Sequence, residues 1–166
     1  MPIIVYRRNT FPEDTLILNG GFERDTTTNS PWGTFSNGTL NKETIALNGA
    51  RAGTYALRMY NDVGGTNVQL NQTGFALTEN AWYRLRFSTK SSTSWYQYSS
   101  ILQNNSPYAL LGYEQGSTEQ FTTWHDYDFT FQAFATETDS KLYFRLDTDL
   151  PNGEWWMIDR VALQAI

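Results

Sequence analysis

The segment WWMIDRVAL, residues 155–163, contains one acidic side chain within a run of apolar residues. Its composition predicts a β-strand in which Asp159 directly follows Ile158 and lies close to Val161. A carboxylate in such surroundings is costly to bury unless a partner compensates its charge. We therefore expect a bound cation or a cluster of hydrogen-bond donors around Asp159.

A second informative segment lies near the other end of the chain, where residues 16–23 read LILNGGFE, a turn sequence after an apolar run. Five shorter motifs follow in order: YALR at 55–58, VQLNQ at 68–72, YRLRFSTKS at 83–91, ILQNNSPY at 101–108 and WHDYDFTF at 124–131. As an ordered set, residues 16–163 resemble the carbohydrate-binding modules of the jelly-roll type in families 4, 9, 16 and 22. The resemblance implies an all-β, two-sheet antiparallel β-sandwich with jelly-roll topology and a non-catalytic, sugar-binding function.

Length and composition agree with one domain of this kind. The 166 residues suit one well-cored domain and are too few for two of ordinary size. Charged residues make up 17% of the chain and aromatic residues 16%, a profile typical of an all-β protein with many polar loops. We expect an N-terminal arm at residues 1–14 and a carbohydrate-binding-module-like sandwich at residues 15–166.

Composition also excludes several classes of site. The net charge of −5 argues against nucleic acid, which attracts clustered Lys and Arg. The chain has no cysteine and only one histidine, His125, so neither a thiolate site nor a metal centre built on imidazoles can form. No pair of acidic residues is marked as a glycosidase pair. We predict that the protein is not an enzyme and that it binds neither nucleic acid nor membrane.

Alternation of apolar and polar residues, the mark of strands with one buried face, recurs along the chain. Three clear runs cover residues 83–88, 126–131 and 142–147, and two further strands are expected at 68–71 and 95–103. We expect the following residues of the three runs to be buried: Phe87, Phe129 and Phe144. We expect these residues to be exposed or partly exposed: Arg84, Asp128 and Tyr143.

The strand at residues 95–103 can face in two ways. If Ile101 is buried, Trp95, Gln97 and Ser99 share its face, and Tyr96, Tyr98 and Leu102 lie outward. If Leu102 is buried, the assignment reverses. The resemblance favours the first arrangement, although family members often have a Gln where this chain has Leu102.

Sugar binding needs exposed rings that stack on pyranose faces and polar side chains that bond to hydroxyl groups. The candidate ligand-binding residues are Trp32, Gln69, Asn71, Tyr96, Tyr98, Gln103, Tyr113 and Arg145. The resemblance further implies a structural calcium ion between Glu23 and Asp159, with carbonyl ligands from residues 48–53. In the alternative, Glu23 is an exposed acid and Asp159 bonds to backbone amides or to Arg160.

These observations favour a module that binds a neutral β-linked polysaccharide in a shallow groove. The rival hypothesis is a structural decoration or adhesion protein of a larger assembly, such as a bacteriophage virion, attached through residues 1–14. Residues 3–6 read IIVY, which predicts a strand that could pair with a sheet edge. The apolar stretch at the N-terminus is too short for a signal peptide or a membrane span. We expect an extracellular location, bacterial secreted or cell-surface, or the surface of a virion.

Overall fold

The computed structural model describes residues 14–23, 31–37, 43–47, 49–61, 66–146 and 150–166. These residues form strands and no helix, so none of them belongs to a helix that could cross a membrane. The strands are β1 (Gly33–Asn37), β2 (Glu43–Leu47), β3 (Tyr55–Tyr60), β4 (Thr66–Leu77), β5 (Trp82–Ser91), β6 (Trp95–Gln103), β7 (Leu110–Gln120), β8 (His125–Gln132), β9 (Glu137–Arg145) and β10 (Trp155–Ala165).

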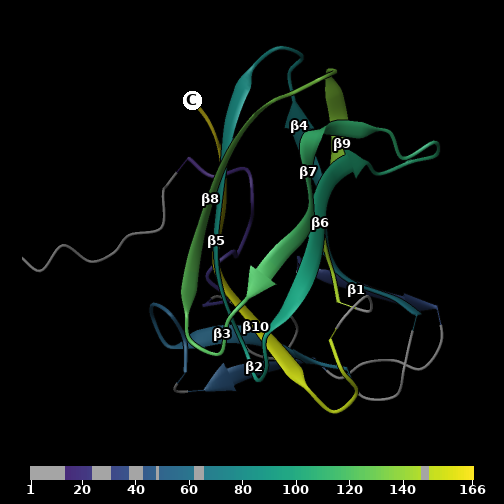
Figure 1. Ribbon diagram of the computed structural model, residues 1–166. Coiled ribbons are helices and arrows are strands. Elements are labelled where there is room, and N and C mark those ends of the chain that lie inside the picture. The colour runs from purple at the N-terminus through teal and green to yellow at the C-terminus, as the bar shows by residue number, and fades with distance from the viewer. Residues whose placement is uncertain (1–13, 24–30, 38–42, 48, 62–65, 147–149) are drawn as a thin grey trace, which may run out of the picture.

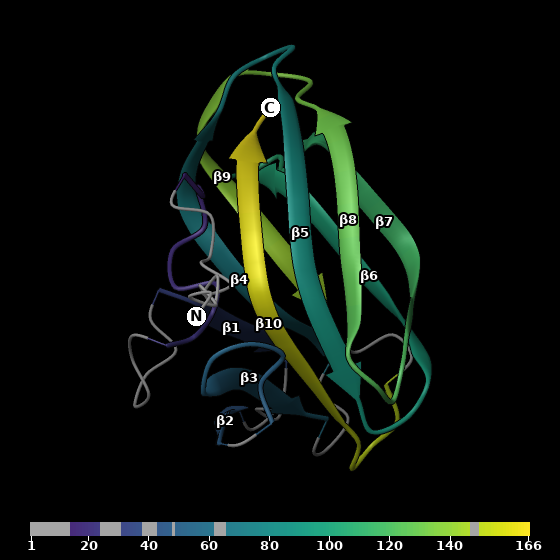
Figure 2. The same cartoon turned by 90° about the vertical axis from the view of Figure 1, so that its left-hand side faces the viewer.

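The strands form two five-stranded antiparallel sheets that pack face to face (Figure 1). Sheet A has the order β1-β4-β9-β6-β7, and sheet B has the order β2-β3-β10-β5-β8. Figure 2 shows β10, β5 and β8 of sheet B side by side. The predicted all-β sandwich is confirmed, and the five strands expected from alternation overlap β4, β5, β6, β8 and β9.

The core lies between the sheets. Phe87 of β5 and Phe144 of β9 meet edge to face with ring centroids 5.1 Å apart, and so join sheet B to sheet A. Both side chains are fully buried, as predicted. Phe129 is only half-buried because β8 is an edge strand, although its ring contacts Phe87 and Tyr113. Its inward direction was predicted correctly, but the expectation of full burial was wrong.

The facing of β6 is the first of the two arrangements considered. Ile101 is fully buried together with the other inward residues of the strand, which are Trp95, Gln97 and Ser99. Tyr96 is 51% exposed, and Tyr98 and Leu102 are half-buried on the outer side. On sheet B, the outward residues Arg84 and Asp128 are exposed, as predicted, and form an ion pair with each other.

The two end segments of the sequence meet along β10. The Leu16 amide donates to the Leu163 carbonyl at 2.8 Å, and the Val161 amide donates to the Gly20 carbonyl at 2.9 Å. Residues 14–23 therefore lie beside the second half of β10, where β3 no longer pairs with it. The strand expected at residues 3–6 falls outside the described residues.

Candidate functional site

One surface of the sandwich gathers most of the predicted sugar-binding residues. It is the outer side of sheet A, and we call it the sheet A face. Cross-strand pairing puts Gln69 of β4 opposite Arg145 of β9, which in turn lies opposite Tyr98 of β6. A second row runs from Asn71 through Tyr143. The sheet A face comprises Phe35, Gln69, Asn71, Tyr96, Tyr98, Leu102, Lys141, Tyr143 and Arg145.

Two tyrosines form the centre of the sheet A face. The Tyr98 and Tyr143 rings lie 5.8 Å apart, tilted by 41°. The Tyr98 hydroxyl donates to a Glu114 carboxylate oxygen, and burial together with this bond raises the Tyr98 pKa well above its ordinary value. The phenol therefore remains a neutral donor. Tyr143 points outward, but the expectation that it is partly exposed was wrong: it is 9% exposed, with Tyr98 on one side and Lys141 above its ring.

Cations lie on the same strand as Tyr143. The Lys141 ammonium lies 5.7 Å from the Tyr143 ring centroid, and burial lowers the Lys141 pKa. Arg145 is half-buried between Gln69 and Tyr98 in the sheet register. Lys141 was not among the predicted residues, yet the alternation that turns Tyr143 and Arg145 outward also turns Lys141 outward. That pattern could have identified it.

Three predicted ligand residues lie elsewhere. Trp32 is 5% exposed in the core, where its indole N–H donates to the Asn19 carbonyl at 3.2 Å. Tyr113 is 2% exposed, because its ring packs against the opposite sheet and its hydroxyl shares a hydrogen bond with Ser99. The expectation that these two rings are exposed was wrong. Gln103 ends β6 and donates to a carboxylate oxygen of Glu137 at 2.9 Å.

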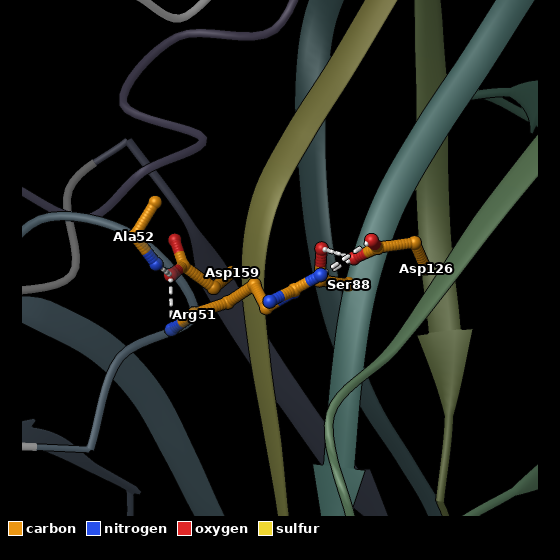
Figure 3. A network of polar contacts seen from close by, with 5 residues as sticks. All are labelled: Arg51, Ala52, Ser88, Asp126 and Asp159. Atoms are coloured by element: carbon orange, nitrogen blue, oxygen red, sulfur yellow. Dashed lines mark hydrogen bonds and ion pairs between the residues drawn. The ribbon is translucent and has the colours of Figure 1, made fainter. Parts of the chain in front are cut away.

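The predicted carboxylate pair lies on the other sheet, under the loop of residues 51–55. Asp159 Oδ2 accepts hydrogen bonds from the backbone amides of Arg51 and Ala52 at 2.9 and 3.0 Å, as Figure 3 shows. Asp159 Oδ1 accepts a third bond from the Arg160 amide at 2.7 Å. Beyond Gly53, Glu23 Oε1 accepts from the backbone amides of residues 54 and 55 at 2.8 and 2.9 Å.

A glycine makes this arrangement possible. Gly53 has a φ of +75°, and a Cβ atom added there would lie 2.2 Å from Glu23 Oε1. Glycine adopts this left-handed conformation readily and leaves room for the carboxylate. The loop between the Asp159 and Glu23 contacts therefore depends on Gly53.

The 51–55 loop also brings a charge to sheet B. The Arg51 side chain forms two hydrogen bonds with the carboxylate of Asp126 on β8, at 3.1 and 2.8 Å. These bonds, with a further one from Ser88, lower the Asp126 pKa to about 2. Asp159 behaves in the opposite way: burial raises its pKa to about 6, the amide bonds oppose the rise, and the charge of Glu23 adds to it.

The residues near Asp159 fit a cluster of hydrogen-bond donors, which was the alternative to a cation. Calcium takes six to eight oxygen ligands. Among the described residues, no group of three or more His, Cys, Asp or Glu side chains could hold a metal ion. The carboxylate oxygens Oδ1 and Oδ2 of Asp159 and Oε1 of Glu23 all accept backbone N–H bonds. The calcium hypothesis stays a prediction.

Solved structures share this fold at low sequence identity. A carbohydrate-binding module of family 4 is 20% identical with a TM-score of 0.66, over 81% of this chain and 94% of that chain. The N-terminal cellulose-binding domain of β-1,4-glucanase C from Cellulomonas fimi is 21% identical with a TM-score of 0.59, over 81% of this chain and 88% of that chain. The enzymatically active domain of tailspike protein 4 from bacteriophage CBA120 is 16% identical with a TM-score of 0.70, over 92% of this chain and 22% of that chain.

These structural likenesses show the fold alone, and no curated protein matches the sequence. A family described as carbohydrate binding domain matches residues 14–152, which is most of the chain. The match begins at the segment beside β10 and includes every strand of the sheet A face. The chain therefore belongs to this family of carbohydrate binding domains.

Proposed function

We propose that this protein binds a β-linked polysaccharide across the sheet A face, with the Tyr98 ring, which Tyr143 supports, as the stacking platform. The observation that supports this most directly is the register of the sheet, which sets amide and guanidinium groups beside the two rings. Gln69 and Asn71 approach from β4, and Arg145 approaches from β9. Rings with polar groups at their edges are what a sugar site requires. The net charge of −5 disfavours a densely charged polyanion as the ligand.

The chemistry of such a face follows from its side chains. The flat C–H surface of a pyranose stacks on the exposed side of the Tyr98 ring, while Gln69, Asn71 and Arg145 bond to hydroxyl groups at the rim of the sugar. The bond from Tyr98 to Glu114 fixes the direction of the phenol. Tyr96, which is 51% exposed on the same strand, extends the aromatic surface toward the start of β6.

Affinity electrophoresis in gels that contain β-glucan or xylan tests the proposal. Tyr98→Ala should weaken binding by about 1 to 3 kcal/mol, a size taken from stacking of aromatic side chains on other ring ligands. The melting temperature should stay near that of the wild type. Trp82→Ala is the matched control, because Trp82 is an exposed ring of sheet B. An equal loss of affinity in both variants would contradict this placement of the site.

We also propose that the module is non-catalytic and lies outside the cell, secreted or at the bacterial cell surface, or on a virion. His125, the one histidine, packs between Phe121 and Tyr127, with ring centroids 4.7 and 4.9 Å away. This setting suits a structural ring better than a general base. Reducing-sugar release from each polymer that binds should therefore equal that of a protein-free blank.

A structural calcium ion at Glu23 and Asp159 is a further proposal. Its support is the position of the pair: Asp159 is fully buried, and the charge of Glu23 contributes to the rise of its pKa. A divalent cation would neutralise both carboxylates, and it would supply no reaction chemistry. The residues that would hold it are Glu23 and Asp159, with carbonyl groups from residues 48–53.

A second candidate function is attachment to a larger assembly through residues 1–14, with residues 15–166 as the folded unit. The supporting observation is that Thr15 bonds to both backbone groups of Leu163, so the chain enters the sandwich beside β10. Deletion of residues 1–14 should abolish partner attachment and leave polysaccharide binding and the melting temperature unchanged. Loss of polysaccharide binding on this deletion would contradict the proposed division of the chain.

A further inference from the structure

Lys141 is a half-buried cation at the centre of the sheet A face. It lies on β9, opposite Thr73 of β4 and Leu102 of β6. Within the described part of the chain, its ammonium lies over the Tyr143 ring and forms no ion pair. A partly desolvated ammonium without an anion is unfavourable. An anionic ligand group would compensate this cost.

The acidic residues of the same region are occupied by other donors. The carboxylate of Asp139, two residues before Lys141, accepts bonds from the side-chain amides of Asn104 and Asn105 at 3.0 and 3.4 Å. Glu137 accepts from Gln103 at 2.9 Å. Glu114 accepts from the Tyr98 hydroxyl. Burial lowers the Lys141 pKa, which agrees with the absence of a charged partner among the described residues.

A second cation extends this feature along the strand. Arg145 lies four residues beyond Lys141 on the same side of β9, roughly 13 Å away at the rise of a strand. Tyr143 lies between them and stacks against Tyr98. The centre of the face therefore alternates cation, ring and cation, a pattern that matches a sugar chain with charged substituents better than an unsubstituted one.

Building on the proposed function, we propose that the polysaccharide carries anionic groups, uronic-acid carboxylates or sulfate esters, and that Lys141 binds one of them beside the Tyr143 ring. The sugar backbone stacks on the accessible rings of Tyr96 and Tyr98, and the anion replaces water at the ammonium. Selection among polymers then depends on the substituent, and Lys141 is the residue that determines it.

Two matched pairs of polymers test this proposal in affinity electrophoresis. The first pair is glucuronoxylan and the same polymer after reduction of its carboxyl groups, and the second is a sulfated β-glucan and its unsulfated parent. The wild type should bind at least one anionic polymer about tenfold more tightly than its neutral partner, which is roughly 1.4 kcal/mol. The polymer pair that shows the preference identifies the anion.

The variants assign the preference to one side chain. Lys141→Gln should remove it, and Lys141→Arg should keep it, because the charge remains. Lys90→Gln is the matched control: Lys90 is also half-buried, but it lies on β5 opposite Met157 in sheet B. Melting temperatures report whether each variant folds.

The outcomes separate this inference from the proposed function. Equal binding of charged and neutral polymers by the wild type would overturn the inference and leave polysaccharide binding intact. A preference that survives in Lys141→Gln would also overturn it. Failure to bind any of the four polymers would count against both proposals.

Discussion

Replacing Asp159 with alanine tests how a buried carboxylate is tolerated in β10. The wild-type side chain accepts three backbone N–H bonds, from Arg51, Ala52 and Arg160. Alanine leaves these donors without an acceptor, which costs roughly 1 kcal/mol for each bond. The free energy of unfolding of the variant is therefore about 3 kcal/mol lower than that of the wild type when the wild-type carboxyl group is neutral.

The cost should depend on pH. Burial, with a contribution from Glu23, raises the Asp159 pKa from 3.8 to about 6. The Asp159 pKa is higher in the folded state than in the unfolded state. The stabilisation that this difference contributes is fully present below about pH 4 and is lost as the pH rises through about 6. At about 1.4 kcal/mol for each pKa unit, the loss is about 3 kcal/mol. At pH near 7 in chelator, Asp159→Ala should then cost close to zero.

Calcium would reverse this trend at neutral pH. An ion that neutralises Glu23 and Asp159 in the folded state stabilises the wild type by about 2.7 kcal/mol at a concentration of about 100 Kd. The Asp159→Ala variant lacks one calcium ligand, so calcium should raise its free energy of unfolding only slightly. Urea denaturation of both proteins at about pH 4, and near pH 7 with chelator or calcium, measures the three differences.

Two results would refute the reasoning. A difference between wild type and variant that is the same at both pH values in chelator would show that Asp159 is not protonated more readily in the folded state. Identical wild-type unfolding curves with chelator and with calcium would rule out the structural ion. Using the difference between two proteins removes the titration of all other groups that behave alike in both.

Further predictions concern the core, the 51–55 loop and the ion pair above it. Phe87→Ala should lower the free energy of unfolding by about 3 to 5 kcal/mol in urea denaturation, and a loss below about 1 kcal/mol would contradict its place in the core. Gly53→Ala should lower the melting temperature more than Gly74→Ala, since both residues have positive φ but only the first would place a Cβ atom against Glu23. The Arg51 guanidinium lowers the Asp126 pKa to about 2. The stabilisation from this ion pair is therefore present above about pH 4 and is lost as the pH falls through 2. Because the pair is exposed, the loss is about 1 kcal/mol, and Asp126→Asn should remove it from the acid-unfolding curve.

Strand alternation made much of the fold predictable. A period of two assigns each side chain of a strand to one face, so the burial of Phe87 and Phe144 followed from the sequence. For β6 the sequence left two phases open, and the resemblance to known modules selected the one in which Ile101 is buried. The candidate site was predictable to the same extent, because Tyr96 and Tyr98 lie outward whenever Ile101 lies inward.

The exposure of individual rings was not predictable in the same way. Tyr113 lies on the same face of β7 as Leu111. Gly112 between them has no side chain, so the sequence shows no alternation of apolar and polar residues from which the buried face of β7 could be predicted. Trp32 precedes the first described strand, and its burial depends on contact with Phe144, a residue of the distant strand β9. Tertiary contacts of this kind are set by the packing of segments far apart in sequence.

The two outer surfaces of the sandwich differ in a way that explains which one is free to bind. On sheet B, the loop that begins at Gly49 crosses the strands: its carbonyl accepts from the Trp124 indole, and Ala50 packs on Ala56 and Met157. The amide bonds to Asp159 and the ion pair with Asp126 hold the same loop in place. Within the described residues, no comparable loop is bonded across the sheet A face. The carboxylates of Asp159 on β10 and Asp126 on β8 thus hold a cover on one sheet, and the uncovered rings of Tyr96 and Tyr98 on the other sheet remain available to a sugar chain.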